Sequence, residues 1–163
     1  RAGGVGGPRG VEGGRGAGGE VSFRAARREG ARALRPQLKF FGAGDLTVFT
    51  TSDALAGAPD PRRTKDLDGI VLPIAPWFLN DGAAAVQREQ ASRRYPDLDN
   101  PTLSRLFAMG RDVFDLLPWL AQMERDPDLY LAGLTGRLRL NDRGLIERDL
   151  PFVRVVDGQA LPE

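Results

Sequence analysis

The chain has 163 residues, a formal net charge of +1, and neither cysteine nor histidine. This composition excludes a disulfide framework, a thiolate or imidazole zinc site, and any nucleophile paired with a catalytic histidine within the chain. About +6 of the charge lies on residues 1–40 and about −5 on the rest, so the part able to form a core is a poor match for a nucleic-acid backbone.

The N-terminal segment is rich in glycine and arginine and has little to bury. We expect residues 1–24 to be disordered and separate from an α/β domain over residues 25–163, because such a composition cannot offset the entropy of ordering. The segment contains short arginine–glycine repeats like those of nucleic-acid-binding tails, but no aromatic residues are interleaved. A plain linker, a tail or a translation artefact is favoured, and no nucleic-acid partner is predicted.

The chain begins with Arg1 rather than methionine, so we expect a processed chain or a fragment. It contains no apolar run long enough to span a membrane. The opening is not the apolar stretch of a signal peptide. The absence of cysteine is compatible with either a periplasmic or a cytoplasmic location.

The first half of the domain alternates helix and strand signals. Residues 25–38 favour a helix that Pro36 ends or kinks. Leu46–Thr50 and Gly69–Ile74 are short, apolar and partly β-branched, as expected of buried strands. A polar loop, residues 52–68, joins them. Two buried strands after a helix indicate α/β layering.

Two further helices follow. Asn80 or Asp81 is a candidate cap for a helix ending near Arg94. Asn100 and Pro101 are a favourable cap and first residue for the next helix. Its apolar residues recur at helical spacing, which predicts that this face packs in the core and that its glycine closely approaches a neighbouring element. The stripe consists of Leu103, Leu106, Phe107, Gly110, Val113, Phe114 and Leu117.

The end of the chain predicts antiparallel strands. Residues 138–140 and 145–148 flank Asn141–Gly144, a hairpin loop with glycine where a positive φ is needed. Phe152–Val156 is another strand, and Asp157-Gly158 marks a further turn.

Candidate sites for chemistry are sparse. A calcium or acid–base site at Asp60, Asp66 and Asp68 is conceivable, but the interspersed basic residues favour charge pairs on a solvated loop. Trp77 and Trp119 are either core residues or anchors for a partner. We predict no catalytic residue, no metal site and no cofactor.

Several motifs together resemble one family. Gly133-Leu-Thr-Gly136 and the closing hairpin look like the end of a type I periplasmic-binding fold. The rest of the set, in this order and spacing, resembles the LppC/LpoA family of penicillin-binding protein activators over about residues 30–163. The motifs are Leu34–Phe41, Thr50–Ser52, Asp60–Gly69, Pro76–Leu79 and Ala108–Val113.

This resemblance implies the fold: an α/β C-terminal lobe of a type I periplasmic-binding-protein-like fold, incomplete and with a C-terminal β-hairpin. It also implies a strand before the first helix, where residues 1–23 look unlike the family. It further implies a non-catalytic lipoprotein of the periplasm, anchored to the outer membrane by a lipid, that activates a peptidoglycan synthase by protein contact. The partner is then a penicillin-binding protein, and the membrane is reached only through the lipid anchor. The alternative is a solute-binding protein for a small molecule of the amino-acid type.

A ligand or partner site is expected in the loop that follows the first buried strand, because open α/β sheets bind ligands at the carboxyl ends of their strands. Exposed charge there, beside a possible aromatic anchor, suits a protein interface. The candidate residues are Ser52, Asp53, Arg62, Asp66, Asp68 and Trp77.

Overall fold

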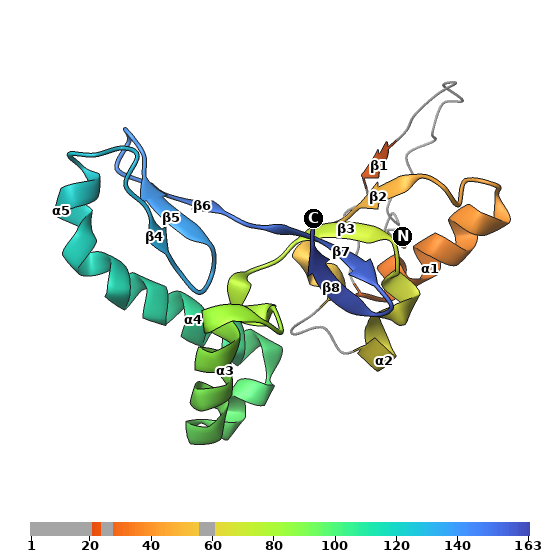
Figure 1. Cartoon of the computed structure of the whole chain (residues 1–163), viewed down its shortest axis with the longest axis horizontal. Helices are drawn as coiled ribbons and strands as arrows, with labels where there is room; N and C mark the ends of the chain where they lie inside the picture. The colour runs from red at the N-terminus through yellow and green to blue at the C-terminus, as the bar shows by residue number, and fades with distance from the viewer. Residues whose placement is uncertain (1–20, 24–27, 56–60) are drawn as a thin grey trace, which may run out of the picture.

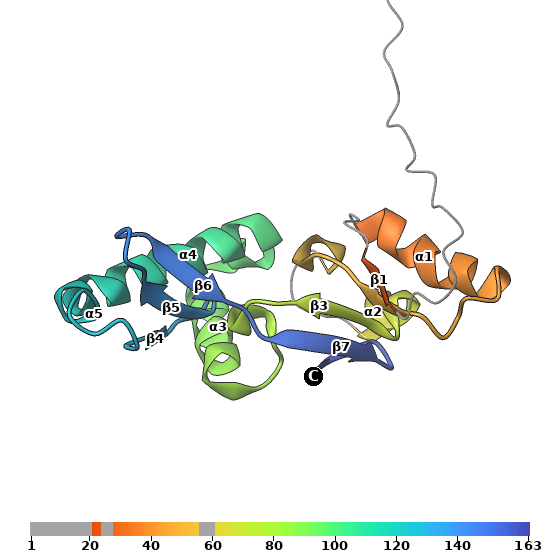
Figure 2. The same cartoon turned by 90° about the horizontal axis from the view of Figure 1, so that it is seen from above.

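The computed structural model describes residues 21–23, 28–55 and 61–163. In these residues the strands form a five-stranded sheet, ordered β1-β2-β3-β7-β8, and a three-stranded sheet, ordered β4-β5-β6. Figures 1 and 2 show the larger sheet with α1 and α2 at one end of the molecule, and the smaller sheet with α3, α4 and α5 at the other. The chain crosses between the ends twice, after β3 and between β6 and β7.

The elements have the following bounds. The strands are β1 Val21–Phe23, β2 Thr47–Phe49, β3 Ile70–Pro73, β4 Leu131–Ala132, β5 Arg137–Leu140, β6 Ile146–Asp149, β7 Phe152–Val156 and β8 Gln159–Pro162. The α-helices are α1 Arg28–Phe40, α2 Pro61–Thr64, α3 Gly82–Arg94, α4 Pro101–Leu116 and α5 Leu120–Met123. Short 3₁₀ turns occur at Ser52–Ala54, Lys65–Leu67, Pro76–Phe78, Pro96–Asp99 and Leu117–Trp119.

The larger sheet is mixed. β1, β2 and β3 are parallel, and β7 joins β3 in the antiparallel sense, with Val71 opposite Arg154. Ile70, Val71 and Leu72 of β3 are all buried, whereas β7 alternates, with Val153 and Val155 buried and Phe152 and Val156 exposed. The predicted strands at Leu46–Thr50, Gly69–Ile74 and Phe152–Val156 are therefore confirmed, with slightly shorter bounds for the first two.

The N-terminal boundary differs from the prediction. Val21–Phe23 forms β1, with Phe23 opposite Phe49 of β2, so disorder up to residue 24 was wrong for these three residues. This is also the strand that the family resemblance implies before the first helix. A three-residue strand after a glycine-rich run is too short to give a periodic signal. The other residues of the expected disordered segment lie outside the described part of the chain. Pro36 lies inside α1 rather than ending it.

The α4 helix begins as predicted but faces the other way. The Asn100 Oδ1 atom accepts hydrogen bonds from the backbone N–H groups of Thr102 at 2.9 Å and Leu103 at 3.3 Å. The buried residues of α4 are Ser104, Ala108, Asp112 and Leu116.

The predicted core stripe of α4 lies mainly on the opposite side. Its leucine, valine and Phe114 side chains are 44–68% exposed, while Phe107 is half-buried. Nothing in the described part of the chain lies within 4 Å of a Cβ built at Gly110. The core-packing prediction for the stripe was therefore wrong, as was the close approach at Gly110. An apolar period identifies a face but not what covers it.

The main core lies between α1, the larger sheet and the Pro76–Phe78 turn, and Trp77 is its largest fully buried side chain. A smaller cluster of Leu116, Met123 and Leu138 joins the end of α4, α5 and β5. Within the described residues, no helix is both long enough and apolar enough to cross a bilayer.

Candidate functional site

The two crossings between the sheets are joined to each other by the backbone. The N–H of Ile74, just after β3, donates to the carbonyl of Pro151 at 3.0 Å, and the N–H of Trp77 donates to the carbonyl of Leu134 at 2.8 Å. The first crossing is thus fixed both to the returning strand and to the Gly133–Gly136 segment. Motifs that are far apart in the sequence meet at this point.

Trp77 anchors this junction from inside. Its side chain is 0% exposed, and its indole N–H donates to the Ser104 hydroxyl at 2.8 Å. Its ring lies 5.6 Å from that of Phe107. Of the two roles left open for Trp77, core residue or partner anchor, the structure shows the core residue, because a buried indole presents no surface to a partner.

Asp112 is the second internal anchor. Its carboxylate accepts hydrogen bonds from the N–H of Leu134 at 2.6 Å and from the N–H and hydroxyl of Thr135 at 2.7 and 2.5 Å. A Cβ at Gly133 would lie 2.8 Å from Asp112 Oδ2. Glycine at this position therefore permits the close approach of the loop to the carboxylate.

Arg88 of α3 holds the Pro76–Phe78 turn in place by hydrogen bonds to its backbone. Its guanidinium donates to the carbonyls of Trp77 and of Leu79, the latter at 2.8 Å. Desolvation lowers the pKa of Arg88 below its ordinary value, but an arginine remains charged at neutral pH. A cation that donates hydrogen bonds to two backbone carbonyls stabilises the turn.

A pocket of about 220 Å³ lies at the edge of the larger sheet where β2 and β3 end. Its wall combines apolar side chains with two arginines and two hydroxyl-bearing residues. The lining residues are Ser52, Leu55, Ile74, Ala75, Phe78, Arg105, Leu106, Ala108, Met109, Thr135, Arg148 and Leu150. A wider hollow of about 690 Å³, lined in part by Leu79, Ala84 and Leu134, contains none of the predicted site residues.

Arg105 is one of two arginines that line the smaller pocket. Its guanidinium lies 3.4 Å from Asp53 Oδ1 and 5.6 Å from the centre of the Phe78 ring. Both members of the ion pair are well exposed, so the pair contributes little to stability and is open to exchange with an incoming charge. Guanidinium groups beside an apolar wall suit a carboxylate, either of a small molecule or of a protein side chain.

The structure divides the predicted site residues between two places. Ser52 and Asp53 follow β2 at the pocket edge. Arg62, Asp66 and Asp68 precede β3, so they lie at the N-terminal end of that strand, away from the pocket. There the N–H of Gly158 donates to Asp68 Oδ1 at 2.8 Å. The latter group borders the β7–β8 turn, so the loop does not form one continuous surface.

The carboxylate cluster considered for calcium is only partly described, because Asp60 lies outside the described residues. Among those residues, no group of three or more histidine, cysteine or carboxylate side chains is placed to hold a metal ion.

Sequence reasoning missed Arg105, Asp112 and Arg148. Arg105 and Asp112 occur on α4, whose strongest sequence signal is its apolar period. The available signal for Asp112 was its place on the face opposite that stripe, at a four-residue spacing from Ala108 and Leu116. Nothing in the sequence marked Arg148, whose place at the pocket depends on the β6 crossing.

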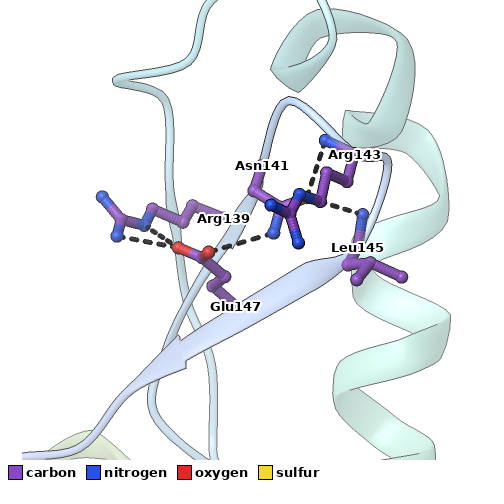
Figure 3. A network of polar contacts seen from close by, with 5 residues as sticks. All are labelled: Arg139, Asn141, Arg143, Leu145 and Glu147. Atoms are coloured by element: carbon purple, nitrogen blue, oxygen red, sulfur yellow. Dashed lines mark hydrogen bonds and ion pairs between the residues drawn. The ribbon is translucent and has the colours of Figure 1, made fainter.

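The β5–β6 hairpin is confirmed and has its own polar network (Figure 3). Asn141 Oδ1 accepts from the N–H groups of Arg143 and Leu145 at 3.0 and 2.9 Å, and Asn141 Nδ2 donates to Glu147 at 3.0 Å. Arg139 also donates to Glu147, at 3.0 Å. The hydrogen bonds from Asn141 and then Arg139 lower the pKa of Glu147.

The profile of the family described as "LppC putative lipoprotein" matches residues 18–158. The chain belongs to this family. The resemblance inferred from the motifs is thereby confirmed, and the match includes β1.

Two relatives share one name. The chain is 27% identical to "Penicillin-binding protein activator LpoA" of Edwardsiella piscicida over 117 residues, which are 72% of this chain and 16% of that protein. It is 26% identical to the protein of the same name from Haemophilus influenzae, over 72% of this chain and 20% of that protein. The chain thus spans at most about a fifth of either relative.

Solved structures agree on the fold. The C-domain of LpoA (YraM) from Haemophilus influenzae, described as a regulator of PBP1A, matches with a TM-score of 0.74 at 20% identity, over 91% of this chain and 46% of that one. A putative branched-chain amino acid ABC transporter from Chromobacterium violaceum matches with a TM-score of 0.53 at 28% identity, over 78% of this chain and 39% of that one. The predicted fold, part of a periplasmic-binding-protein-like α/β domain, is confirmed.

Proposed function

We propose that this chain belongs to a non-catalytic regulator that activates a peptidoglycan synthase, a penicillin-binding protein, by direct contact. We place it in the periplasm, in a protein held at the outer membrane by a lipid. The observation that carries the proposal is the LppC-family match over residues 18–158, together with the shared name of its relatives.

The roles of the polar residues support a binding protein rather than an enzyme. The carboxylate of Asp112 is engaged by backbone N–H groups, that of Asp68 by Gly158, and that of Glu147 by the hairpin. These groups hold turns in place. The sequence has no histidine or cysteine to act as a base or nucleophile.

We assign the partner contact to the pocket edge, at Ser52, Asp53 and Arg105. Asp53 and Arg105 present opposite charges at the surface, and such rim charges steer and orient a protein partner more than they add affinity. Arg62, Asp66 and Asp68 form a second candidate surface at the other edge of the sheet, where Asp68 also supports the β7–β8 turn.

The test uses a purified bifunctional penicillin-binding protein and measures glycan polymerisation, crosslinking and binding. It is run with this chain and with any longer protein that contains it, produced without lipid. We expect stimulation by the longer protein and weaker binding for Asp53→Arg. Asp66→Arg tests the second surface, and Asp142→Arg at the tip of the β5–β6 hairpin is the matched control. Absence of binding and stimulation with the longer protein would refute the function.

The lining of the pocket supports one alternative function, the binding of a small solute. Its apolar wall with Arg105 and Arg148 fits a small carboxylate with an apolar body. Thermal-shift measurements against amino acids and muropeptides decide between the two. Tight binding of an amino acid that depends on Arg105, without any effect on the synthase, would favour the solute-binding role.

A further inference from the structure

The pocket where β2 and β3 end has a lining whose charge is all of one sign. Among its lining residues Arg105 and Arg148 are cationic, Ser52 and Thr135 carry hydroxyl groups, the others are apolar, and none is a carboxylate. An apolar pocket bordered by two guanidinium groups attracts an anion and opposes a cation.

Arg148 is available to an incoming anion. It is exposed, and in the part of the chain that the structure describes no carboxylate is paired with it. Its stem lies close to Gly136, whose φ is 145° and where a Cβ would come within 2.8 Å of Arg148 Cγ. Glycine there leaves room for the stem, while the N–H donors of the guanidinium remain for solvent or for a ligand.

Arg105 reaches the same pocket from α4. Its guanidinium lies 5.6 Å from the centre of the Phe78 ring, and Phe78 is buried. Its ion pair with Asp53 is long, at 3.4 Å, and exposed, so the pair is weak and leaves most of the donors of the guanidinium unused. Two arginines that are far apart in the sequence therefore line one pocket, an arrangement that suits a carboxylate.

The size of the pocket favours a single side chain over a complete ligand. Its volume of about 220 Å³ is below the roughly 300–1,000 Å³ of pockets that enclose a drug-sized molecule. In protein interfaces, small apolar pockets of this kind receive individual anchor residues of the partner.

The charge of the lining distinguishes a peptide carboxylate from a free amino acid. A free amino acid brings an ammonium group with its carboxylate, and the lining has no carboxylate to receive it. Asp53 is already paired with Arg105, and Asp112 accepts hydrogen bonds from the N–H groups of Leu134 and Thr135. An ammonium beside two guanidinium groups would be repelled and left without a partner. The carboxylate of a Glu or Asp side chain has no such cost.

We propose that this pocket receives an acidic side chain of a partner polypeptide, with the carboxylate at Arg105 and Arg148 and a neighbouring apolar side chain in the apolar part of the pocket. The inference deepens the proposed function, on which the identity of the partner as a penicillin-binding protein rests. Arg148 is the specificity-determining residue, because its guanidinium is not shared with a carboxylate of the described chain.

The first test uses capped peptides and does not involve the synthase. Ligand-observed NMR measures the binding of acetyl-Glu-Leu-amide, acetyl-Gln-Leu-amide and free leucine to this chain and to a longer protein that contains it. We expect the glutamyl peptide to bind about tenfold more tightly than the glutaminyl peptide, and free leucine not to compete.

Arg148→Gln should abolish that preference, although glutamine keeps the stem carbons near Gly136. Arg143→Gln at the tip of the β5–β6 hairpin is the matched control and should retain it (Figure 3), since Arg143 is likewise exposed and has no ionic partner among the described residues. No preference for the glutamyl peptide, competition by free leucine, or binding to this chain but not to the longer protein would overturn the proposal. The last result would show that the longer protein itself covers the pocket.

The second test measures the affinity of the longer protein, produced without lipid, for a purified bifunctional penicillin-binding protein. Arg148→Gln should weaken binding by about tenfold and reduce its dependence on salt, because a charge pair is lost, whereas Arg143→Gln should change neither. Stimulation of the synthase by the wild type together with unchanged binding of Arg148→Gln would overturn this inference and leave the function standing. Absence of binding and stimulation with the wild type would instead refute the function, and with it the partner named here.

Discussion

Asp112 on α4 holds Thr135 by two hydrogen bonds, one from the backbone N–H at 2.7 Å and one from the hydroxyl at 2.5 Å. The two residues are 23 positions apart; Asp112 lies in the Ala108–Val113 motif of the family resemblance, and Thr135 in the Gly133–Gly136 motif that resembles a type I periplasmic-binding fold. Their contact fixes the Gly133–Gly136 segment on the helix that lines the pocket. A carboxylate that accepts several backbone N–H groups forms strong, charge-assisted bonds.

Asp112→Asn should destabilise the chain by about 1–3 kcal/mol, because an amide NH₂ then faces a buried backbone donor and one N–H loses its acceptor. Urea denaturation followed by circular dichroism measures this as a lower midpoint. Asp115→Asn is the control: its partner Arg111 is at the surface, so the urea midpoint should change little. Equal midpoints for the two variants would contradict the anchoring role.

Gly133→Ala and Gly110→Ala should have opposite effects. At Gly133 the added Cβ meets the Asp112 carboxylate at 2.8 Å, and the displacement should cost about 1–3 kcal/mol. At Gly110 the space is open, and alanine in an exposed helix should stabilise the chain by up to about 1 kcal/mol. Urea midpoints test both, and a loss of stability for Gly110→Ala would reinstate a core position for this glycine.

The features that could be predicted from sequence were those with local causes. The Asn100-Pro101 helix start depends on a side chain bonding the next turn of its own helix. The Asn141–Gly144 hairpin depends on an Asn side chain and a glycine with φ of 72°. Both signals lie within a few residues of the structure that they specify.

The features that could not be predicted depend on distant segments. The side chain of Ser104 is buried because Trp77, on another element, donates to it. Leu106, with the stronger apolar signal, stays exposed. Residues 52–68 include both groups of predicted site residues. One group follows the C-terminal end of β2 and the other precedes the N-terminal end of β3, so residues that are close in sequence are not close in space.

Ser104→Ala should cost about 1–3 kcal/mol, because it leaves the buried Trp77 indole N–H without an acceptor. Fluorescence in a Trp119→Phe background reports on Trp77 alone. That emission should resist acrylamide quenching, since Trp77 is fully buried, whereas Trp119 is 41% exposed. Ser92→Ala on α3 is the control and should leave the urea midpoint nearly unchanged. Ready quenching of Trp77 in the folded chain would show that the junction is open in solution.

Glu147 should make the β5–β6 hairpin sensitive to acid. Hydrogen bonds from Asn141 and Arg139 lower its pKa below the ordinary value of 4.5, so the folded hairpin favours the ionised form. The stabilisation is therefore fully present above that value and is lost as the pH falls through the folded-state pKa. Carboxyl NMR shifts of Glu147 against pH should give a midpoint below 4.5. Asn141→Asp retains an acceptor for the Arg143 and Leu145 N–H groups but removes the donor to Glu147 (Figure 3). The midpoint should rise in this variant, since a donor is lost and a like charge is added, and an unchanged midpoint would show that Asn141 does not set the pKa.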